Sequence, residues 1–415
     1  MELRQLKGME LAARKRITYD GHGFSVPSQS RADPYRVTLR PSESCACEDF
    51  QLRHLPCKHV FAARFVQERE FGGHAAAVDT DRLPKRPTYK QDWPAYNLAQ
   101  SVEKRRLQVL LAELCRGVEG PPAPRVGRRP HAARDALFAM TLKVYTGFSS
   151  RRCACDLDEA LARGHLSRRV PGMKVSAFLE DEAFTGPLKG LITRSSLPLR
   201  AVETTFAPDS SGFSTSRFVR WYDEKYGVHR SGHDWVKAHL MSGVKTNIVT
   251  AVEIRGRDAN DAPILPGLLL TTVGRGFDVK EVPADKGYSS VENLEAIHAA
   301  GATPYIPFKS NATGGSGGLW EKMFHYYNCF RAEFLAHYHK RSNVESVFSM
   351  IKAKFRDHIR GRTDTAMVNE ALCKILCHNL CVLIQSQCEL GIEASFWDKE
   401  TDADPDILPM PARGE

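Results

Sequence analysis

The chain has 415 residues, of which 42% are hydrophobic and 26% are charged, a composition typical of a globular protein with roughly two to four domains. Lysine and arginine outnumber aspartate and glutamate by 58 to 49, which gives a net charge of +9 and favours a polyanionic partner. The start of the chain has no apolar signal-peptide core, and no stretch reads as a membrane span. We therefore expect a cytoplasmic protein whose 11 cysteines are metal ligands or buried thiols rather than disulfides.

Four residues of metal-ligand type lie close together near the N-terminus. A C-x-C pair followed by a C-x-H pair supplies three thiolates and one imidazole, which is a ligand set of structural zinc. The second pair stands where a helix is predicted to begin, and a helix N-terminus favours a deprotonated thiol. His54 lies between the two pairs and ranks below His59 as a ligand. The predicted Zn²⁺ ligands are Cys45, Cys47, Cys57 and His59.

This spacing resembles that of the SWIM zinc finger, which is a ββα unit. Alternating runs at 23–27 and 35–39 predict two strands, and the run from 60 to 66 predicts a helix. The resemblance implies a small zinc-finger module over residues 1–75.

Residues 76–130 are predicted to form a linker. Two basic, proline-rich stretches flank a helical pattern over 99–115, and such stretches are typical of linkers or arms. The second stretch carries Arg128 and Arg129. We expect these two arginines to contact DNA phosphates or the minor groove, with a solvated arm as the alternative.

Residues 131–198 read as a helical segment. Short helices with breaks at glycines fit a helix-turn-helix-like DNA-binding unit, and a plain packing module fits equally well. Cys153-Ala-Cys155 lacks partner ligands nearby and is interpreted as structural or incidental. The predicted helices are 131–145, 157–163, 175–180 and 186–194.

The pattern changes at about residue 199 to alternating strands and helices. The first strand is predicted to end at Asp209, and a later one to stop at Asp285. Between them, two strands are expected to form a hairpin about Gly243. The remaining predictions are strands over 237–243, 247–255 and 302–308, helices over 263–273 and 289–300, and a loop over 311–318.

The stretch from Tyr338 to Lys352 contains no glycine or proline and is predicted to be one helix. Tyr338, Arg341, Glu345 and Lys352 are three, four and seven positions apart, so they would share one face. A solvated face with i,i+4 ion pairs is the alternative interpretation. The neighbouring apolar stripe, which should face a core, is Val344, Phe348, Ile351 and Phe355.

Two aspartates at strand ends and one helix glutamate can converge on a two-metal site. Carboxylate oxygens suit Mg²⁺ or Mn²⁺. The candidate acids are Asp209, Asp285 and Glu345. Turn capping is the alternative for each aspartate, with Asp234 as the fallback first acid, and Asp258 and Asp261 are interpreted as solvated loop residues.

These motifs resemble those of bacterial insertion-sequence DDE transposases. Tyr338-x2-Arg341-x3-Glu345-x6-Lys352 reproduces the Y-R-E-K signature of that family. Ala284-Asp285-Lys-Gly-Tyr288 resembles its second-acid motif, and Asp209-Ser-Ser-Gly its first. The resemblance covers residues 199–360 and implies an α/β fold with a ribonuclease H-like, mixed-sheet catalytic core.

The same resemblance implies roles for individual residues. Asp209, Asp285 and Glu345 would be the catalytic acids that hold Mg²⁺ or Mn²⁺. The DNA-contacting residues near the transposon-end phosphates would be Tyr338, Arg341 and Lys352.

The implied function is a DNA transposase that cleaves transposon ends and transfers the strands into target DNA by two-metal phosphoryl transfer. Its expected partner is double-stranded DNA, bound by a homo-oligomer in the nucleoid. A catalytically silent zinc-finger regulator derived from a transposase and a nuclease without strand transfer remain alternatives.

The C-terminal region is predicted to contain a helix over 361–397 and a disordered tail over 398–415. Cys373, Cys377 and Cys381 recur at helical spacing and indicate a buried stripe of thiols rather than a metal site.

Overall fold

The computed structural model divides into two compact units, Met1–Pro87 with Tyr305–His339, and Thr88–Pro304 with Lys340–Glu415. The side chains of residues 3, 14, 70, 71, 215 and 342–345 lie outside the description, although their backbone is described. The predictions on Arg128, Asp234, Asp258 and the 398–415 tail also fall outside it. The structure describes residues 3–14, 17–28, 33–39, 42–71, 92–120, 129–215, 225, 227, 235–256, 259–309, 312–315 and 317–397.

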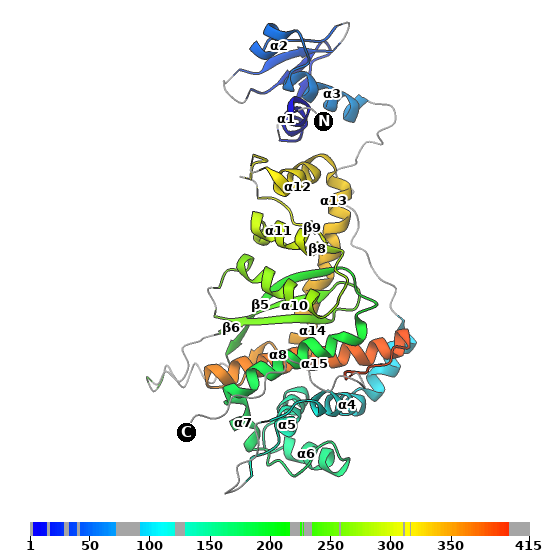
Figure 1. The fold of residues 1–415 in the computed structure, drawn as a ribbon, viewed down its shortest axis with the longest axis vertical. Helices are drawn as coiled ribbons and strands as arrows, with labels where there is room; N and C mark the ends of the chain where they lie inside the picture. The colour runs from blue at the N-terminus through cyan, green and yellow to red at the C-terminus, as the bar shows by residue number, and fades with distance from the viewer. Residues whose placement is uncertain are drawn as a thin grey trace. The chain divides into compact units, whose positions relative to one another are not determined.

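The N-terminal part of the first unit is a four-stranded antiparallel sheet with three helices (Figure 1). The two predicted strands and the predicted helix are confirmed. The first helix was not predicted, and it packs against the third through Leu11, which is buried with Val60 in one core. The elements are α1 (Leu3–Arg14), β1 (Thr18–Tyr19), β2 (Phe24–Val26), β3 (Tyr35–Thr38), β4 (Ser44–Cys45), α2 (Glu48–Arg53) and α3 (Lys58–Phe71).

The first unit also contains α12 (Gly318–Cys329) and α13 (Arg331–Tyr338). Both helices are rich in aromatic residues, and Phe334 of α13 is fully buried. Its ring lies 5.1 Å from that of Tyr327 and 5.4 Å from that of Tyr305. Edge-on packing of this kind holds the two helices together.

The second unit is built on a mixed sheet in the order β10-β5-β6-β7. The β5–β6 and β6–β7 pairs are antiparallel, and β10 lies parallel to β5. The predicted hairpin about Gly243 is therefore confirmed. The strands are β5 (Phe206–Thr215), β6 (Trp235–Gly243), β7 (Val249–Arg255) and β10 (His358–Ile359).

Two further short strands, β8 (Glu281–Pro283) and β9 (Thr303–Tyr305), pair with each other. A parallel bridge between Thr205 and Glu281 places β8 beside the start of β5. Strand β6 occupies one edge of β5. On the other edge, β10 pairs with the end of β5 and β8 lies beside its start. The strand order at the start of β5 is therefore β7-β6-β5-β8-β9.

Helices cover both faces of the sheet (Figure 1). On one face, Thr272 of α10 (Leu265–Gly274) and Thr250 of β7 share a hydrogen bond of 2.8 Å. On the other, Phe348 of α14 packs near Phe213 of β5, with ring centroids 6.4 Å apart. The helices that join α10 around the sheet are α11 (Val291–Ala299), α14 (Ser342–Phe355) and α15 (Asp364–Leu390).

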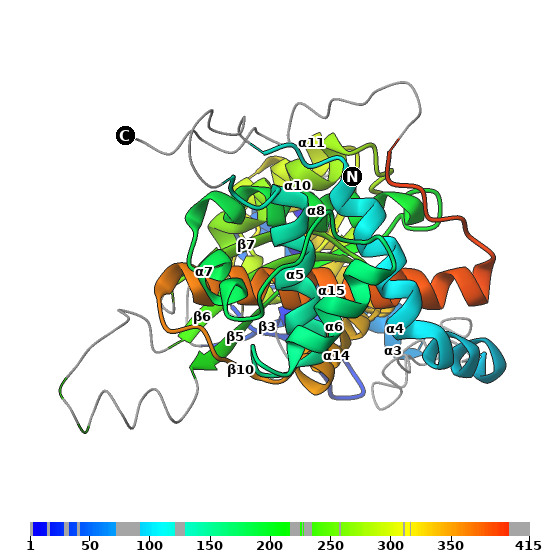
Figure 2. The same ribbon diagram turned by 90° about the horizontal axis from the view of Figure 1, so that it is seen from below.

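The predicted helical segment 131–198 is confirmed as helical, and it shares one core with the α14 face of the sheet. Figure 2 shows α15 running behind α5 and α6, beside α4. Short 3-10 turns are η1 (Glu182–Phe184), η2 (Leu197–Leu199), η3 (Ala262–Ile264), η4 (Lys286–Tyr288) and η5 (His339–Arg341). The helices are α4 (Trp93–Arg116), α5 (Ala133–Thr146), α6 (Cys153–Ala162), α7 (Lys174–Leu179) and α8 (Thr185–Ser196).

Helix α15 is the central helix of this core. By length and composition it could cross a membrane, which the sequence analysis did not expect. However, 89% of its apolar 18-residue stretch is buried inside the protein. Cys373 and Cys377 are buried in it, as predicted. The Asn379 side chain bonds both the N–H and the C=O of Val249, at 2.9 and 2.7 Å. The helix thus fixes the start of β7.

Two predictions about element boundaries are wrong. Strand β5 does not end at Asp209 but continues to Thr215, because every residue from 206 to 214 pairs with β6. The stretch 338–352 is not one helix either. Tyr338 ends α13, η5 follows, and α14 begins at Ser342. Phe348, Ile351 and Phe355 of the predicted apolar stripe are buried as expected.

Candidate functional site

The four predicted zinc ligands come together in the first unit. Their ligand atoms all lie within 4.8 Å of one another, and all four residues are buried. The Nδ1 atom of His59 is 3.8 Å from the sulfur of Cys45 and 3.8 Å from that of Cys57. Tetrahedral ligands about 2.3 Å from a zinc ion stand roughly 4 Å apart. The cluster therefore fits a structural zinc ion.

The local fold explains how these ligands converge. Cys45 ends β4, Cys47 precedes α2, and Cys57 immediately precedes α3, whose second residue is His59. His54 ends α2 with a left-handed backbone, is exposed, and is not among the clustered residues. The choice of His59 over His54 is consistent with this geometry.

The thiols of the cluster differ in acidity. A hydrogen bond from the Cys45 thiol lowers the pKa of Cys57 to about 4, and the Val60 N–H of α3 contributes to the same effect. The same sulfur–sulfur contact raises the pKa of Cys45. Cys57 is thus a ready thiolate at the N-terminus of a helix, as predicted.

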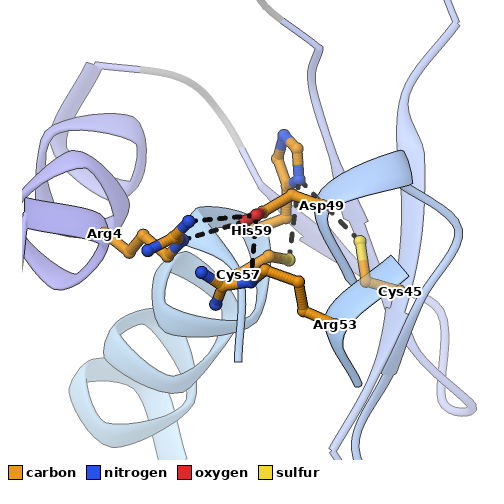
Figure 3. Close-up of polar contacts among 6 residues, drawn as sticks. All are labelled: Arg4, Cys45, Asp49, Arg53, Cys57 and His59. Carbon is orange, nitrogen blue, oxygen red and sulfur yellow. Dashed lines mark hydrogen bonds and ion pairs between the residues drawn. The ribbon is translucent and has the colours of Figure 1, made fainter. Parts of the chain in front are cut away.

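An ion-pair network borders the cluster (Figure 3). The Nε and Nη2 atoms of Arg4 each lie 3.2 Å from an oxygen of the Asp49 carboxylate. The Nε atom of Arg53 lies 3.4 Å from Oδ1 of the same carboxylate. Arg4 belongs to α1, so this network ties the unpredicted helix to the finger. A cavity of about 370 Å³ lies here, and basic residues that include Arg4, Lys7 and Lys58 line it.

In the second unit, a single parallel bridge sets β8 beside the start of β5, upstream of Asp209 and Asp285. Thr205 and Glu281 are bridged in parallel register, and each acid lies four residues further along its own chain segment. Asp209 lies within β5, and Asp285 follows the end of β8 as the N-cap of η4.

Tyr288 is a buried residue of η4 near these charges. Burial raises the pKa of its phenol, and the carboxylates of Asp261, Asp209 and Asp285 raise it further. All three carboxylates therefore lie close enough to act on one buried hydroxyl. The positive charge of Arg341 lowers the same pKa.

Asp285 also caps a turn, as the alternative interpretation held. Its Oδ1 accepts a 2.8 Å hydrogen bond from the N–H of Lys286, at the start of η4. Such a cap uses one lone pair of one oxygen. It fixes the carboxylate at the end of β8 and is compatible with cation binding.

Helix α14 is anchored at both ends near this acid pair. Before its first turn, Lys340 forms a 2.7 Å ion pair with Glu281 of β8. Near its end, Lys352 donates a 2.7 Å hydrogen bond to Ser211 of β5, two residues after Asp209. Glu345 lies in the first turn of α14, between these anchors, and its side chain is outside the described residues.

The other predicted DNA-contacting residues lie on other elements. Tyr338 is half-buried at the end of α13, in the other compact unit. Arg129 is exposed just before α5, where its carbonyl accepts a hydrogen bond from Arg168.

The prediction that Asp261 is a solvated loop residue is wrong. Its carboxylate lies 2.6 Å from the Lys237 ammonium and 3.3 Å from Nδ1 of His239. The predictions from sequence also missed His239, which is fully buried on β6. The available signal was a histidine in the middle of an apolar strand. Burying a polar ring costs free energy unless it has a polar partner, so this pattern indicates a partner nearby.

Comparison with known families agrees with this geometry. Residues 200–380 match the transposase DDE domain, and residues 35–63 match the SWIM zinc finger. No curated protein and no solved structure matches the chain. The chain therefore combines a transposase DDE domain with an N-terminal SWIM zinc finger.

Proposed function

We propose that the chain is a transposase that cleaves the DNA ends of its own element and joins them to target DNA. The observation that supports this proposal is the parallel bridge between Thr205 and Glu281, which sets β8 beside the start of β5, with Asp209 and Asp285 each four residues further along the chain. Glu345, on the helix anchored beside them, is the third acid. The match to the transposase DDE domain covers all three.

The donor set suits Mg²⁺ or Mn²⁺. Paired carboxylates on neighbouring strands, with a third on an adjacent helix, offer the oxygen ligands that these hard cations prefer. The chemistry that such cations supply is activation of the attacking oxygen and stabilisation of the leaving oxygen in a phosphodiester exchange. Asp209, Asp285 and Glu345 would hold them.

Two cations of the chain itself are suited to hold the DNA. Lys352 donates a hydrogen bond to Ser211, which lies two residues after Asp209 on β5. The positive charge of Arg341 lowers the pKa of the Tyr288 phenol. Arginine and lysine bind phosphate oxygens through charge-assisted hydrogen bonds. We assign both to the backbone of the bound strand, where they position the scissile phosphate.

The strand order supports a ribonuclease H-like core. A hairpin of β5, β6 and β7 is followed by β8 and β9 on the opposite edge of β5. This order puts the first acid on an inner strand and the second at the end of its parallel neighbour. Ligand sites gather at such strand ends in α/β sheets.

The remaining parts are assigned to DNA recognition and assembly. The zinc finger, residues 131–198 and the arm around Arg129 would bind double-stranded DNA, consistent with the net charge of +9. Holding two transposon ends together requires at least a dimer. A DNA-acting enzyme of this kind would work at the nucleoid in the cytoplasm.

The proposal is tested with the full chain and a DNA fragment carrying the sequences that flank its gene. Wild type should cut this DNA in Mg²⁺ and join the cut ends to a target plasmid. Glu345→Ala should bind the same DNA with unchanged affinity but lose cleavage by a factor of about 10³ or more, because the third acid is missing.

Glu295→Ala is the matched control, since Glu295 is an exposed acid on α11. It should cleave like wild type. Cleavage by Glu345→Ala at the wild-type rate would reject the assignment. A wild-type protein that binds the ends but never cuts them would favour the silent regulator, and cutting without joining would favour a nuclease.

A further inference from the structure

An arginine with a strained backbone follows helix α14. Arg356 has φ 72° and ψ 151°, a region of backbone conformation that residues other than glycine rarely adopt. Its side chain is exposed, so burial of that side chain does not explain the residue. Strain of this kind persists where the surrounding structure enforces it, and it gathers at functional positions.

Two buried charged residues of α15 enforce this bend. The Lys374 ammonium donates hydrogen bonds to the carbonyls of Arg356 and His358, at 3.1 and 2.7 Å. The Glu370 carboxylate accepts hydrogen bonds from the N–H groups of Arg360 and its successor, at 2.9 and 2.7 Å. Lys374 and Glu370 are both buried, whereas the side chains of Arg356 and Arg360 are exposed. The segment 356–361 is therefore fixed through its backbone, and its arginines face solvent.

Both arginines lie beside Gly147, which ends helix α5. The Nη1 atom of Arg360 donates a 2.8 Å hydrogen bond to the Gly147 carbonyl. A Cβ added to Gly147 would lie 3.9 Å from two nitrogens of the Arg356 guanidinium. Among the residues that the structure describes, neither guanidinium forms an ion pair, and Asp357 lies 3.2 Å from the Nδ1 atom of His358 instead. Two like charges held this close repel each other.

Two more arginines follow Gly147 in the turn that leads into α6. Arg151 and Arg152 are exposed, and within the described part of the chain neither forms an ion pair. The N–H of Cys153 bonds the carbonyl of Ser149 at 2.9 Å, so the turn is tight and keeps both arginines near Gly147. We call this group of four the Gly147 patch: Arg151, Arg152, Arg356 and Arg360.

The Gly147 patch lies further along β5 than Asp209. His358 of β10 stands opposite Ser214 of β5, and Ser214 follows Asp209 by five residues. At about 3.3 Å per residue, this distance along the strand is about 17 Å. Lys352, which bonds Ser211, lies between the two places. Duplex DNA bound at Asp209 would reach the patch after about five base pairs, at about 3.4 Å per base pair.

We propose that the Gly147 patch binds phosphates of the DNA backbone. Arginine forms bidentate, charge-assisted hydrogen bonds with phosphate oxygens. A phosphate between Arg356 and Arg360 also removes the repulsion of their like charges. This inference rests on the proposed function, which supplies the identity of the polyanion and the place where the DNA is cut. It explains an arginine at a position whose backbone favours glycine.

The inference is tested by binding of the zinc-loaded full chain to a fluorescein-labelled duplex that carries the sequences flanking its gene. Anisotropy gives the dissociation constant over a series of salt concentrations. Arg356→Gly should raise it about three- to tenfold and lower the slope of log K against log salt by about 1, because one phosphate contact is lost. Arg356→Lys should keep the slope and lose part of the affinity, because the charge remains but the planar fork does not.

The melting temperature separates binding from folding. Arg356→Gly should melt at the wild-type temperature or above it, because glycine adopts this backbone without strain. Weaker binding by a variant as stable as wild type identifies a contact with DNA. A variant that melts lower and loses affinity in step would overturn the inference, because Arg356 would then act on the fold.

Arg163→Ala is the matched control. Arg163 is an exposed arginine at the other end of α6, and its guanidinium already pairs with Glu159 at 2.6 Å. The variant loses the same charge as Arg356→Gly. Its dissociation constant and its salt slope should nevertheless match those of wild type.

A neutral methylphosphonate, moved step by step along the duplex, locates the contact. It should weaken binding by wild type about five base pairs from the cleavage site. At that position it should not weaken binding by Arg356→Gly, because the side chain and the phosphate charge act as one pair. Equal losses for both proteins at every position would contradict the inference.

The inference and the proposed function fail in different ways. If wild type cuts the DNA and Arg356→Gly binds it with wild-type affinity and slope, the phosphate site is rejected and the cleavage proposal stands. If binding depends on Arg356 as expected and wild type never cuts, the phosphate site stands and the cleavage proposal is rejected. A wild-type chain that does not bind this DNA rejects both.

Discussion

Cys47 is the zinc-cluster residue whose replacement tests that cluster most simply. We expect the wild-type chain to hold about one zinc ion per molecule and Cys47→Ser to release it. Metal binding contributes directly to the folding of small zinc modules, so residues 1–75 should lose protection from hydrogen exchange before the rest of the chain does.

Zinc released by a chelator can be measured with a colorimetric indicator, and exchange by mass spectrometry. Cys155→Ser is the control, because this thiol is exposed on α6. It should retain zinc. A wild-type chain without zinc, or a Cys47→Ser variant that keeps it, would remove the metal from this module.

Lys374 makes the stability of the second unit depend on pH. Its ammonium is buried, donates to the carbonyls of Arg356 and His358 at 3.1 and 2.7 Å, and has a pKa lowered to about 8 by burial. Between pH 8 and the model-compound value of 10.5, the unfolded chain holds this proton and the folded chain does not. The free energy of unfolding should therefore rise with pH in that window.

The expected contribution is up to about 1.4 kcal/mol per pH unit. Lys374→Met should lack this rise and should also be less stable at pH 7, because two buried carbonyls lose their donor. Urea unfolding of both proteins between pH 7 and 10.5 measures the difference. Parallel stability curves for wild type and variant would contradict the prediction.

Individual residues differ in how far the sequence predicts them. The zinc ligands lie within fifteen positions, so their spacing alone is informative. Asp261 contacts Lys237 and His239 of β6, which lie 24 and 22 positions earlier in the sequence. No local pattern encodes that meeting, and Asp261 was misjudged as solvated for this reason.

At the scale of elements, the β5–β6 pair explains the glycine of the Asp209-Ser-Ser-Gly motif. A side chain on Gly212 would place its Cβ 2.5 Å from the indole ring of Trp235. Gly212→Ala should therefore lower the free energy of unfolding by about 1–3 kcal/mol, the usual cost of overpacking.

Gly267→Ala is the matched substitution in helix α10, where an added Cβ meets no atom within 4 Å. It should raise the free energy of unfolding by about 0.5–1 kcal/mol, because alanine favours the helix. Thermal or denaturant unfolding measures both changes. A Gly212→Ala variant as stable as wild type would show that the Trp235 ring moves aside freely.

Elements with a clear hydrophobic period or a clear capping or turn residue were predicted well. Examples are α11, which Ser290 caps, and the β6–β7 hairpin. The 338–352 stretch shows the limit. It carries no helix-breaking residue, yet η5 interrupts it at His339–Arg341. Lys340 in this turn pairs with Glu281, and such a tertiary contact is absent from any helical pattern.

At the scale of the whole molecule, the order of the parts was predicted better than their packing. The SWIM zinc-finger match at 35–63 precedes the transposase DDE match at 200–380, in the expected order. The sequence did not indicate that α4, α5 and α8 would share one core with α15 and the sheet, because such packing joins residues far apart in the chain, as the contacts of Asn379 with Ile192 and Ser195 show.

The central claim is that Asp209, Asp285 and Glu345 form one cation site. The most direct measurement replaces Mg²⁺ with Fe²⁺ in the zinc-loaded full chain and adds ascorbate and peroxide, so that hydroxyl radicals cut the backbone beside the bound ion. The account predicts cuts near residues 209, 285 and 345 that excess Mg²⁺ suppresses and Asp285→Ala removes. Cuts confined to other segments, or cuts that persist in Asp285→Ala, would contradict it.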